Sequence, residues 1–161
     1  MSEQTEGASN GSEAEGPKEV IIYGDGEGLD QEVFVGSHRM WADEPTESGG
    51  SDRGPDPYDL LLASLGACTS ITVTMYAQRE GLPLRGITTR LRHSSVHADD
   101  CAEAETEEGK IDRIELDIGL DGPLSDEQRS QLLGIAEKCP VHRSLTSETV
   151  IRIGSDDDES N

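Results

Sequence analysis

Two cysteines occupy the positions of this sequence that are best suited to chemistry. Cys68 lies in the middle of "DPYDLLLASLGACTSITVTMYAQREG", residues 56–81, and Cys139 ends a second predicted helix in "KCPVHR". A single cysteine in an apolar helix usually acts as a small hydrophobic residue. A second cysteine at a helix end, followed directly by Pro140 and then by basic residues, favours a chemical role for the pair over packing alone.

The N-terminal segment predicts a reducing compartment for these thiols. "MSEQTEGASNGSEAEGP" has neither the basic nor the apolar region of an export signal. We therefore expect a cytoplasmic protein, in which cysteines serve chemistry more often than structural cross-linking. A structural disulfide between residues as distant as Cys68 and Cys139 fits that compartment poorly.

The composition excludes some classes of partner. The chain has 161 residues, of which 32% are hydrophobic and 3% aromatic, and a formal net charge of −21 from 34 acidic and 13 basic residues. Such a charge repels nucleic-acid phosphates and anionic membranes, so neither is an expected partner. The acid also favours solubility and, because it is spread along the chain, adaptation to the cytosol of a halophile.

The pattern of residues predicts an α+β domain over 18–153, between acidic tails at 1–17 and 154–161 that we expect to be disordered. The predicted order is βββ-α-ββ-α-β. Asp56 and Pro57 start the long helix, and Ser125 with Gln128 forms a capping box for the second helix. The other predicted elements are strands in 18–24, 31–37, 38–44, 84–96, 111–120 and 149–153, with helices from 57 to about Glu80 and over 125–139.

The long helix carries no charge from Leu60 to Thr74, which raises the question of a membrane span. Those fifteen residues include five serines and threonines. A span needs about 20 predominantly apolar residues, so we expect a buried helix of a soluble protein. Its apolar residues lie on nearly all sides, and a small, aromatic-poor chain cannot cover them alone. This predicts an obligate homodimer with the two long helices at its centre.

"GPDPYDLLLASLGACTSITVTMYAQREGLPL" together with "CPVHRSL" resembles the OsmC/Ohr family, and the likeness extends from about Val33 to Ile153. The resemblance, which is to the OsmC-like branch, implies an intertwined homodimer with curved antiparallel sheets outside. It also implies a thiol peroxidase that reduces organic hydroperoxides in oxidative or osmotic stress defence. In that mechanism Cys68 attacks the peroxide and Cys139 resolves the sulfenic acid. No cofactor is expected, and an unidentified dithiol recycles the disulfide.

The resemblance further implies that an arginine on the N-terminal strands and a carboxylate at the start of the central helix activate the thiol. Arg39 is the first candidate for the cation, with Arg53 behind it. The peroxidases carry glutamate at the position of Tyr58, so Asp59 and Glu44 are the candidate carboxylates.

Tyr58 favours a second hypothesis, a non-catalytic OsmC-like stress protein that binds a small hydrophobic ligand or senses redox state. A third hypothesis is a structural domain with inert cysteines.

The remaining candidates have weaker patterns. Cys101, in the acidic loop, is expected to be exposed and to have no primary redox role. His97 and His142 lie near cysteines, but no closely spaced pair of metal ligands is present, so no metal is expected. His142 and Arg143 are expected to polarise Cys139 or to cover the dimer seam.

Overall fold

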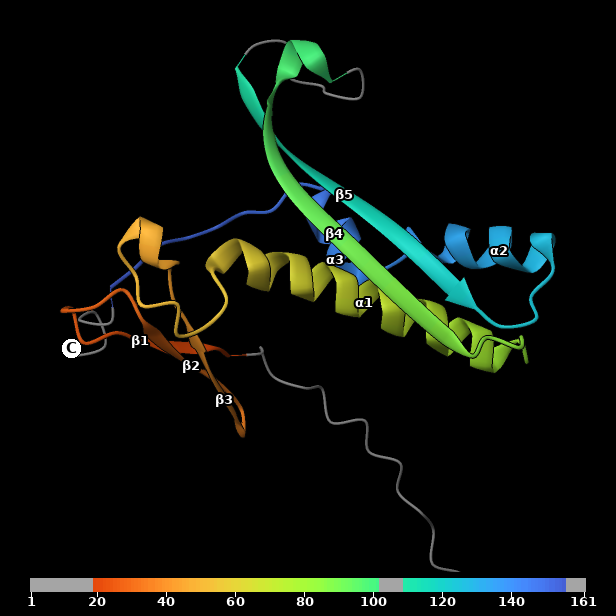
Figure 1. The fold of residues 1–161 in the computed structure, drawn as a ribbon, viewed down its shortest axis with the longest axis horizontal. Coiled ribbons are helices and arrows are strands. Elements are labelled where there is room, and N and C mark those ends of the chain that lie inside the picture. Colours follow the sequence, from red (N-terminus) through yellow and green to blue (C-terminus); the bar gives the residue numbers. More distant parts are fainter. Residues whose placement is uncertain (1–18, 102–108, 156–161) are drawn as a thin grey trace, which may run out of the picture. The chain divides into compact units, whose positions relative to one another are not determined.

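The computed structural model describes residues 19–101 and 109–155, and the chain divides after Asp56 into two compact units, which are described separately below. Figure 1 shows the elements of both units. The tails that were predicted to be disordered, 1–17 and 154–161, fall almost entirely outside the described residues, so that prediction stays open.

The first unit is a three-stranded antiparallel sheet in the order β1-β2-β3. The strands are β1 (Ile21–Tyr23), β2 (Gln31–Val35) and β3 (His38–Ala42), which confirms the predicted hairpin and third strand. Gly36 begins the tight turn from β2 to β3 with a φ of 58°, in the left-handed region that a two-residue hairpin turn requires. A 3-10 turn, η1 (Thr46–Ser48), lies in the loop that follows β3.

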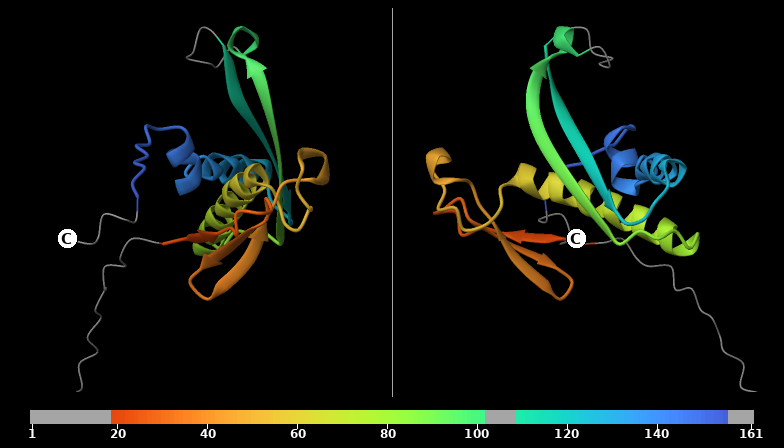
Figure 2. Two further views of the ribbon diagram at one scale, coloured as in Figure 1. Left: turned by 90° about the vertical axis from the view of Figure 1, so that its left-hand side faces the viewer. Right: turned by 45° about the vertical axis from the view of Figure 1, so that its right-hand side comes forward.

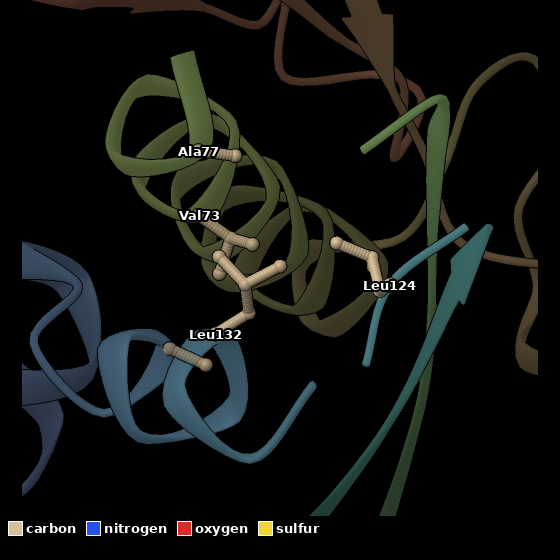
Figure 3. Close-up of a cluster of buried hydrophobic side chains, with 5 residues drawn as sticks. Val73, Ala77, Leu124 and Leu132 are labelled. Carbon is tan, nitrogen blue, oxygen red and sulfur yellow. The ribbon is translucent and has the colours of Figure 1, made fainter. Parts of the chain in front are cut away.

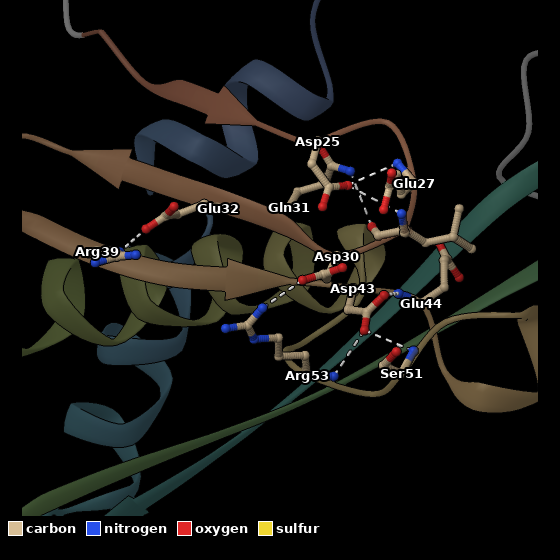
Figure 4. A network of polar contacts seen from close by, with 12 residues as sticks. Asp25, Glu27, Asp30, Gln31, Glu32, Arg39, Asp43, Glu44, Ser51 and Arg53 are labelled. Carbon is tan, nitrogen blue, oxygen red and sulfur yellow. Dashed lines mark hydrogen bonds and ion pairs between the residues drawn. The ribbon is translucent and has the colours of Figure 1, made fainter.

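A buried aspartate organises that loop. Asp43 is 2% exposed, and its carboxylate accepts backbone N–H groups from Glu44 at 2.8 Å, Ser51 at 2.9 Å and Arg53 at 3.1 Å (Figure 4). These hydrogen bonds favour the ionised carboxylate, and the pKa of Asp43 is lowered, with the Arg53 amide as the largest cause. The sequence predicts a loop here, and the structure adds the charged residue at its centre.

The second unit packs helices against a long antiparallel hairpin, as Figures 1 and 2 show. Strands β4 and β5 pair along their whole length, from Gly86 opposite Asp121 to His97 opposite Lys110. The elements are α1 (Pro57–Arg79), β4 (Gly86–His97), the 3-10 turn η2 (Ala98–Asp100), β5 (Lys110–Asp121), α2 (Asp126–Ala136) and α3 (Pro140–Leu145).

Helix α1 packs against β4 at Gly66, where two side chains of the strand approach the helix backbone. A Cβ atom at Gly66 would lie 2.7 Å from the Leu91 Cδ1 atom and 3.1 Å from the Thr89 Oγ1 atom, so only glycine fits without a shift. The helix ends at Arg79, and Gly81, two residues later, has a φ of 63° and provides the left-handed residue that commonly follows a helix. Both ends of α1 therefore agree with the sequence prediction.

The hydrophobic core of this unit lies between α1 and α2. Leu132 projects from α2 toward Val73 of α1, and both side chains are fully buried (Figure 3). Ala77 and Ala136 extend this cluster along the two helices, and Leu124 joins it from the segment before α2. Burying large aliphatic side chains is the main stabilising contribution in such a core.

Only one stripe of α1 is buried within a single chain. On the other side of the helix, Ile71 and Met75 are 59% and 64% exposed. By length and composition alone, α1 is the one helix of the described residues that could cross a membrane. A core helix of a soluble domain meets the same criteria, and α1 packs against β4, α2 and α3. The predicted coverage on most sides is not provided by one chain.

The second half of the chain both confirms and corrects the predicted order. Ser125 and Gln128 form the predicted capping box, with hydrogen bonds of 2.9 and 3.2 Å. Pro140, which was expected to end the helical region, instead begins α3, because the first helical position needs no N–H donor. The predicted last strand over 149–153 is wrong: this segment pairs with no strand of the described chain. The α+β class is confirmed, with the order βββ-α-ββ-α-α.

A candidate thiol site

The structure brings the side chains of Cys68 and Cys139 together. Cys68 lies near the middle of α1, and Cys139 is the residue directly before α3, which packs against α1. Both cysteines are free thiols, and a hydrogen bond joins their side chains. Two cysteines that are distant in the sequence thus form one site.

The two thiols differ in their exposure. Cys139 is fully buried, whereas Cys68 is partly exposed. Thr69, the residue after Cys68, is also fully buried, and its hydroxyl lies near enough to Cys139 to favour that thiolate but forms no hydrogen bond of good geometry within the described chain. A peroxide from solvent would therefore meet Cys68 first, with Cys139 behind it.

The surroundings of Cys139 favour its thiolate. Burial opposes ionisation, but the pKa of Cys139 is lowered because donors outweigh that effect: the Cys68 thiol first, then the His142 amide, the Thr69 hydroxyl and the Val141 amide. Neither amide has the geometry of a full capping hydrogen bond, so their effect is mainly electrostatic.

The surroundings of Cys68 have the opposite effect. Burial and the hydrogen bond to Cys139 raise the pKa of Cys68, and the Val141 amide and the Thr72 hydroxyl offset only part of that rise. Of the two thiols, Cys139 is therefore the one whose ionisation the surroundings favour, with Cys68 as the hydrogen-bond donor to it.

The opposite shifts of the two pKa values predict that the two thiols ionise in separate steps. In a Cys101→Ser background, we expect the ultraviolet thiolate absorbance to rise in two steps, one below and one above the pH at which an ordinary cysteine titrates. Replacing Cys139 by serine should lower the pKa of Cys68, because Cys139 is among the causes that raise it. Replacing Cys68 by alanine should raise the pKa of Cys139. A single step at the ordinary pH in all three proteins would contradict this arrangement.

The predicted cations lie in the first unit, each with a partner there. Arg39 on β3 forms an ion pair with Glu32 on the neighbouring strand. Arg53 binds Asp30 at 2.7 Å and places its guanidinium 3.3 Å from the centre of the Trp41 ring (Figure 4 shows both ion pairs). The role of either arginine toward Cys68 stays a prediction.

The predicted carboxylates are divided between the units. Glu44 belongs to the loop around Asp43 in the first unit, and Asp59 lies in the first turn of α1, in the second unit with the thiols. Their activating roles also stay predictions.

Tyr58, at the position of the expected glutamate, stacks on His93 of β4 with ring centres 4.3 Å apart. The Nε2 atom of His93 lies 2.9 Å from the Asp112 carboxylate on β5. Tyr58 thus contributes to the contact between α1 and the hairpin.

Several site groups were missed from the sequence. Thr69 and Thr72 follow Cys68 by one and four residues, and this helical spacing was the only signal they offered. His142 and Arg143 were expected to polarise Cys139 or to cover the dimer seam; the structure shows an effect of the His142 backbone amide, and the roles of the two side chains stay predictions. The expectation of an exposed Cys101 was wrong: its N–H binds the Ala98 carbonyl at 3.0 Å, and the residue is half-buried. No group of three His, Cys, Asp or Glu side chains in the described ranges could hold a metal.

The fold and the thiol pair define an α+β protein with two interacting cysteines in one core. A comparison with family profiles matches residues 49–154 to the OsmC-like protein family, and the chain belongs to that family. No curated protein gives a significant match.

Solved structures share the fold at low sequence identity. An OsmC-like protein from Mycoplasma pneumoniae is 16% identical over 81% of this chain and 87% of its own, with a TM-score of 0.63. The organic hydroperoxide resistance protein OsmC from Legionella pneumophila is 20% identical over 81% and 89%, with a TM-score of 0.59. An organic hydroperoxide resistance protein from Elizabethkingia anophelis is 16% identical over 83% and 91%, with a TM-score of 0.61.

Proposed function

We propose that this protein is a thiol-dependent peroxidase that reduces organic hydroperoxides in oxidative or osmotic stress defence. The observation that carries the proposal is the direct contact between a partly exposed thiol, Cys68, and a buried thiol with a lowered pKa, Cys139. Two of the structural neighbours are described as organic hydroperoxide resistance proteins, which supports the same activity.

In the oxidative half of the reaction, the bonds that form and break belong to the two thiols and the peroxide. Cys68 transfers its proton to Cys139, and the resulting Cys68 thiolate attacks the terminal oxygen of the hydroperoxide. The O–O bond breaks, Cys68 becomes a sulfenic acid, and the alkoxide takes the proton from Cys139 to leave as the alcohol. The Cys139 thiolate then attacks the Cys68 sulfur, which forms the disulfide and releases hydroxide. An external dithiol reduces the disulfide and completes the cycle.

The remaining parts of the proposal concern activation and assembly. Arg39, with Asp59 or Glu44, would favour the Cys68 thiolate and replace the missing glutamate at the position of Tyr58. Exposed Ile71 and Met75 on α1 support a homodimer, because a second α1 would cover them. We place the protein in the cytoplasm, where reduced thiols persist.

The test is a thiol count before and after one equivalent of cumene hydroperoxide. We expect two of the three thiols to disappear rapidly and peptide mapping to find a Cys68–Cys139 disulfide. The Cys101→Ser variant should lose its two remaining thiols at the same rate. If no thiol is lost over minutes, the peroxidase proposal is wrong.

A second candidate function is a non-catalytic stress protein that binds a small ligand or senses redox state. Tyr58 favours it, because the ring that replaces the glutamate is held against His93. A disulfide that forms stoichiometrically, but that no dithiol reduces at a useful rate, would point to the sensor.

A further inference from the structure

One polar side chain interrupts the buried stripe of α1. The stripe follows the four-residue spacing of one helix face and consists of Leu65, Thr69, Val73 and Ala77, all at most 4% exposed. Three of these side chains are apolar, as a face toward the core requires. Valine at position 69 would have nearly the same shape without burying a hydroxyl. The hydroxyl of Thr69 therefore needs an explanation other than packing.

The Thr69 hydroxyl lacks the hydrogen bond that hydroxyls commonly make in helices. A helical serine or threonine often donates to a backbone carbonyl three or four residues earlier. Ser64 does so to Leu61 at 2.7 Å, and Thr146, directly after α3, donates to the His142 carbonyl at 2.9 Å. The Thr69 oxygen has no such partner within the described chain. A buried polar group of this kind destabilises the fold and points to a role in function.

The reactive group beside the Thr69 hydroxyl is the sulfur of Cys139. Thr69 follows Cys68 directly on α1, and α3, which Cys139 precedes, packs against α1. Consecutive helical side chains point about 100° apart, so a group that contacts both lies between them. Cys139 is fully buried there, is hydrogen-bonded to the Cys68 thiol and has its thiolate favoured by Thr69. Thr72, one turn beyond Cys68, acts on the Cys68 sulfur instead.

The donors around Cys139 change during the proposed reaction. In the reduced pair the Cys68 thiol is the largest of the groups that favour the Cys139 thiolate. Once Cys68 is a sulfenic acid, that S–H donor no longer exists. The new S–O–H cannot replace it in the closing step, because the thiolate must approach the sulfur opposite the S–O bond that breaks. The amides of Val141 and His142 lack the geometry of a full capping bond, so Thr69 is the one side chain left among these donors.

We propose that the Thr69 hydroxyl stabilises the Cys139 thiolate while Cys68 is a sulfenic acid, and that it thereby sets the rate at which the disulfide forms. The inference rests on the proposed function, because the peroxide reaction creates the sulfenic acid. The Thr69 hydroxyl donates to the Cys139 sulfur, this thiolate attacks the Cys68 sulfur, the S–O bond breaks and hydroxide leaves. Thr69 itself is neither oxidised nor deprotonated. Rapid closure also limits further oxidation of the sulfenic acid by a second peroxide.

The first test follows disulfide formation after one equivalent of cumene hydroperoxide, by quenched flow and mass spectrometry over a range of pH. Loss of a hydrogen bond to a charged group shifts its ionisation by about tenfold, and the more basic thiolate gains about threefold in nucleophilicity. We therefore expect Thr69→Val to slow disulfide formation about threefold at low pH, where Cys139 is mostly protonated. At high pH, where Cys139 is ionised in both proteins, the variant should be as fast as the wild type or faster. Thr69→Ser keeps the hydroxyl and should follow the wild-type profile.

Thr72→Val is the matched control, because it removes a hydroxyl from the same helix three residues later. It should slow formation of the sulfenic acid, since the Thr72 hydroxyl favours the Cys68 thiolate, and leave the disulfide step unchanged. A Thr69→Val profile that is slower than wild type by the same factor at every pH would indicate a packing effect and overturn the proposal. So would an equal effect of Thr72→Val on the disulfide step.

A titration without peroxide separates this inference from the peroxidase proposal. In a protein with both Cys68→Ala and Cys101→Ser, Cys139 is the one remaining thiol. Thr69→Val should raise its pKa in the ultraviolet titration, and Thr69→Ser should not. Normal turnover with no change in the titration or the pH profile overturns the role of Thr69 and leaves the peroxidase intact. A raised pKa in a protein that no peroxide oxidises supports the effect of Thr69 on Cys139 and overturns the peroxidase.

Discussion

Replacing Cys68 with serine is expected to lower kcat/KM for cumene hydroperoxide by a factor of at least about 10³–10⁴, because the attacking nucleophile is lost. Cys68 is the partly exposed member of the pair, whereas Cys139 is fully buried and cannot replace it. The measurement is peroxide consumption with a dithiol reductant in excess. Cys101→Ser, which removes a thiol elsewhere in the chain, should keep wild-type turnover.

Cys139→Ser provides the contrasting result. Its Cys68 thiol should still react once with peroxide, and the sulfenic acid should persist long enough to be trapped with dimedone. In the wild type the same trapping should fail, because Cys139 is in contact with Cys68 and forms the disulfide first. Full turnover in Cys68→Ser, or a trapped adduct at Cys139, would show that the roles are assigned to the wrong cysteines.

Leu132→Ala is expected to lower the free energy of unfolding by about 2–5 kcal/mol, the range for removing a buried leucine side chain. Leu132 is fully buried between α1 and α2, and its loss would leave a cavity against Val73. Urea denaturation at one fixed protein concentration measures the change.

The neighbouring leucine is the control for this prediction. Leu133 is 45% exposed, so Leu133→Ala should cost less than half as much. Equal losses for the two variants would mean that the core is not centred on Leu132.

The sequence predicted most of this fold, because its elements carry local signals. Pro57 and Gly81 mark the ends of α1, and the capping box of Ser125 marks the start of α2. The errors fall where local signals are ambiguous. Pro140 can either stop a helix or start one, and the sequence alone did not distinguish these cases. The residues at 149–153 alternate as a strand does, but a strand also needs a partner, which no local pattern reveals.

The candidate site was predicted only in part, because local signals identify its cysteines but not the groups around them. Cys68 and Cys139 have distinctive surroundings in the sequence, and the structure brings them together. Thr69 acts on Cys139 only because α1 packs against α3, whereas the amides of Val141 and His142 belong to the first turn of the helix that Cys139 precedes. Almost every residue has a backbone amide, so a sequence does not indicate which amides act on a thiol. A threonine next to a cysteine in a helix gives no signal of its own either. Which thiol ionises more readily therefore depends in part on tertiary contacts, those of Cys139 with Cys68 and Thr69.

Gly66 has no side chain, yet it affects how the helix that carries a reactive sulfur packs. The Leu91 and Thr89 side chains of β4 pack against α1 at that point, so the missing side chain lets the helix lie close to the hairpin. Cys68 is only two residues away and moves with the helix as a rigid body. A larger residue at position 66 would require the Leu91 and Thr89 side chains or the helix itself to shift. The packing of the helix that carries Cys68 thus depends in part on a position that has no side chain and takes no part in the chemistry.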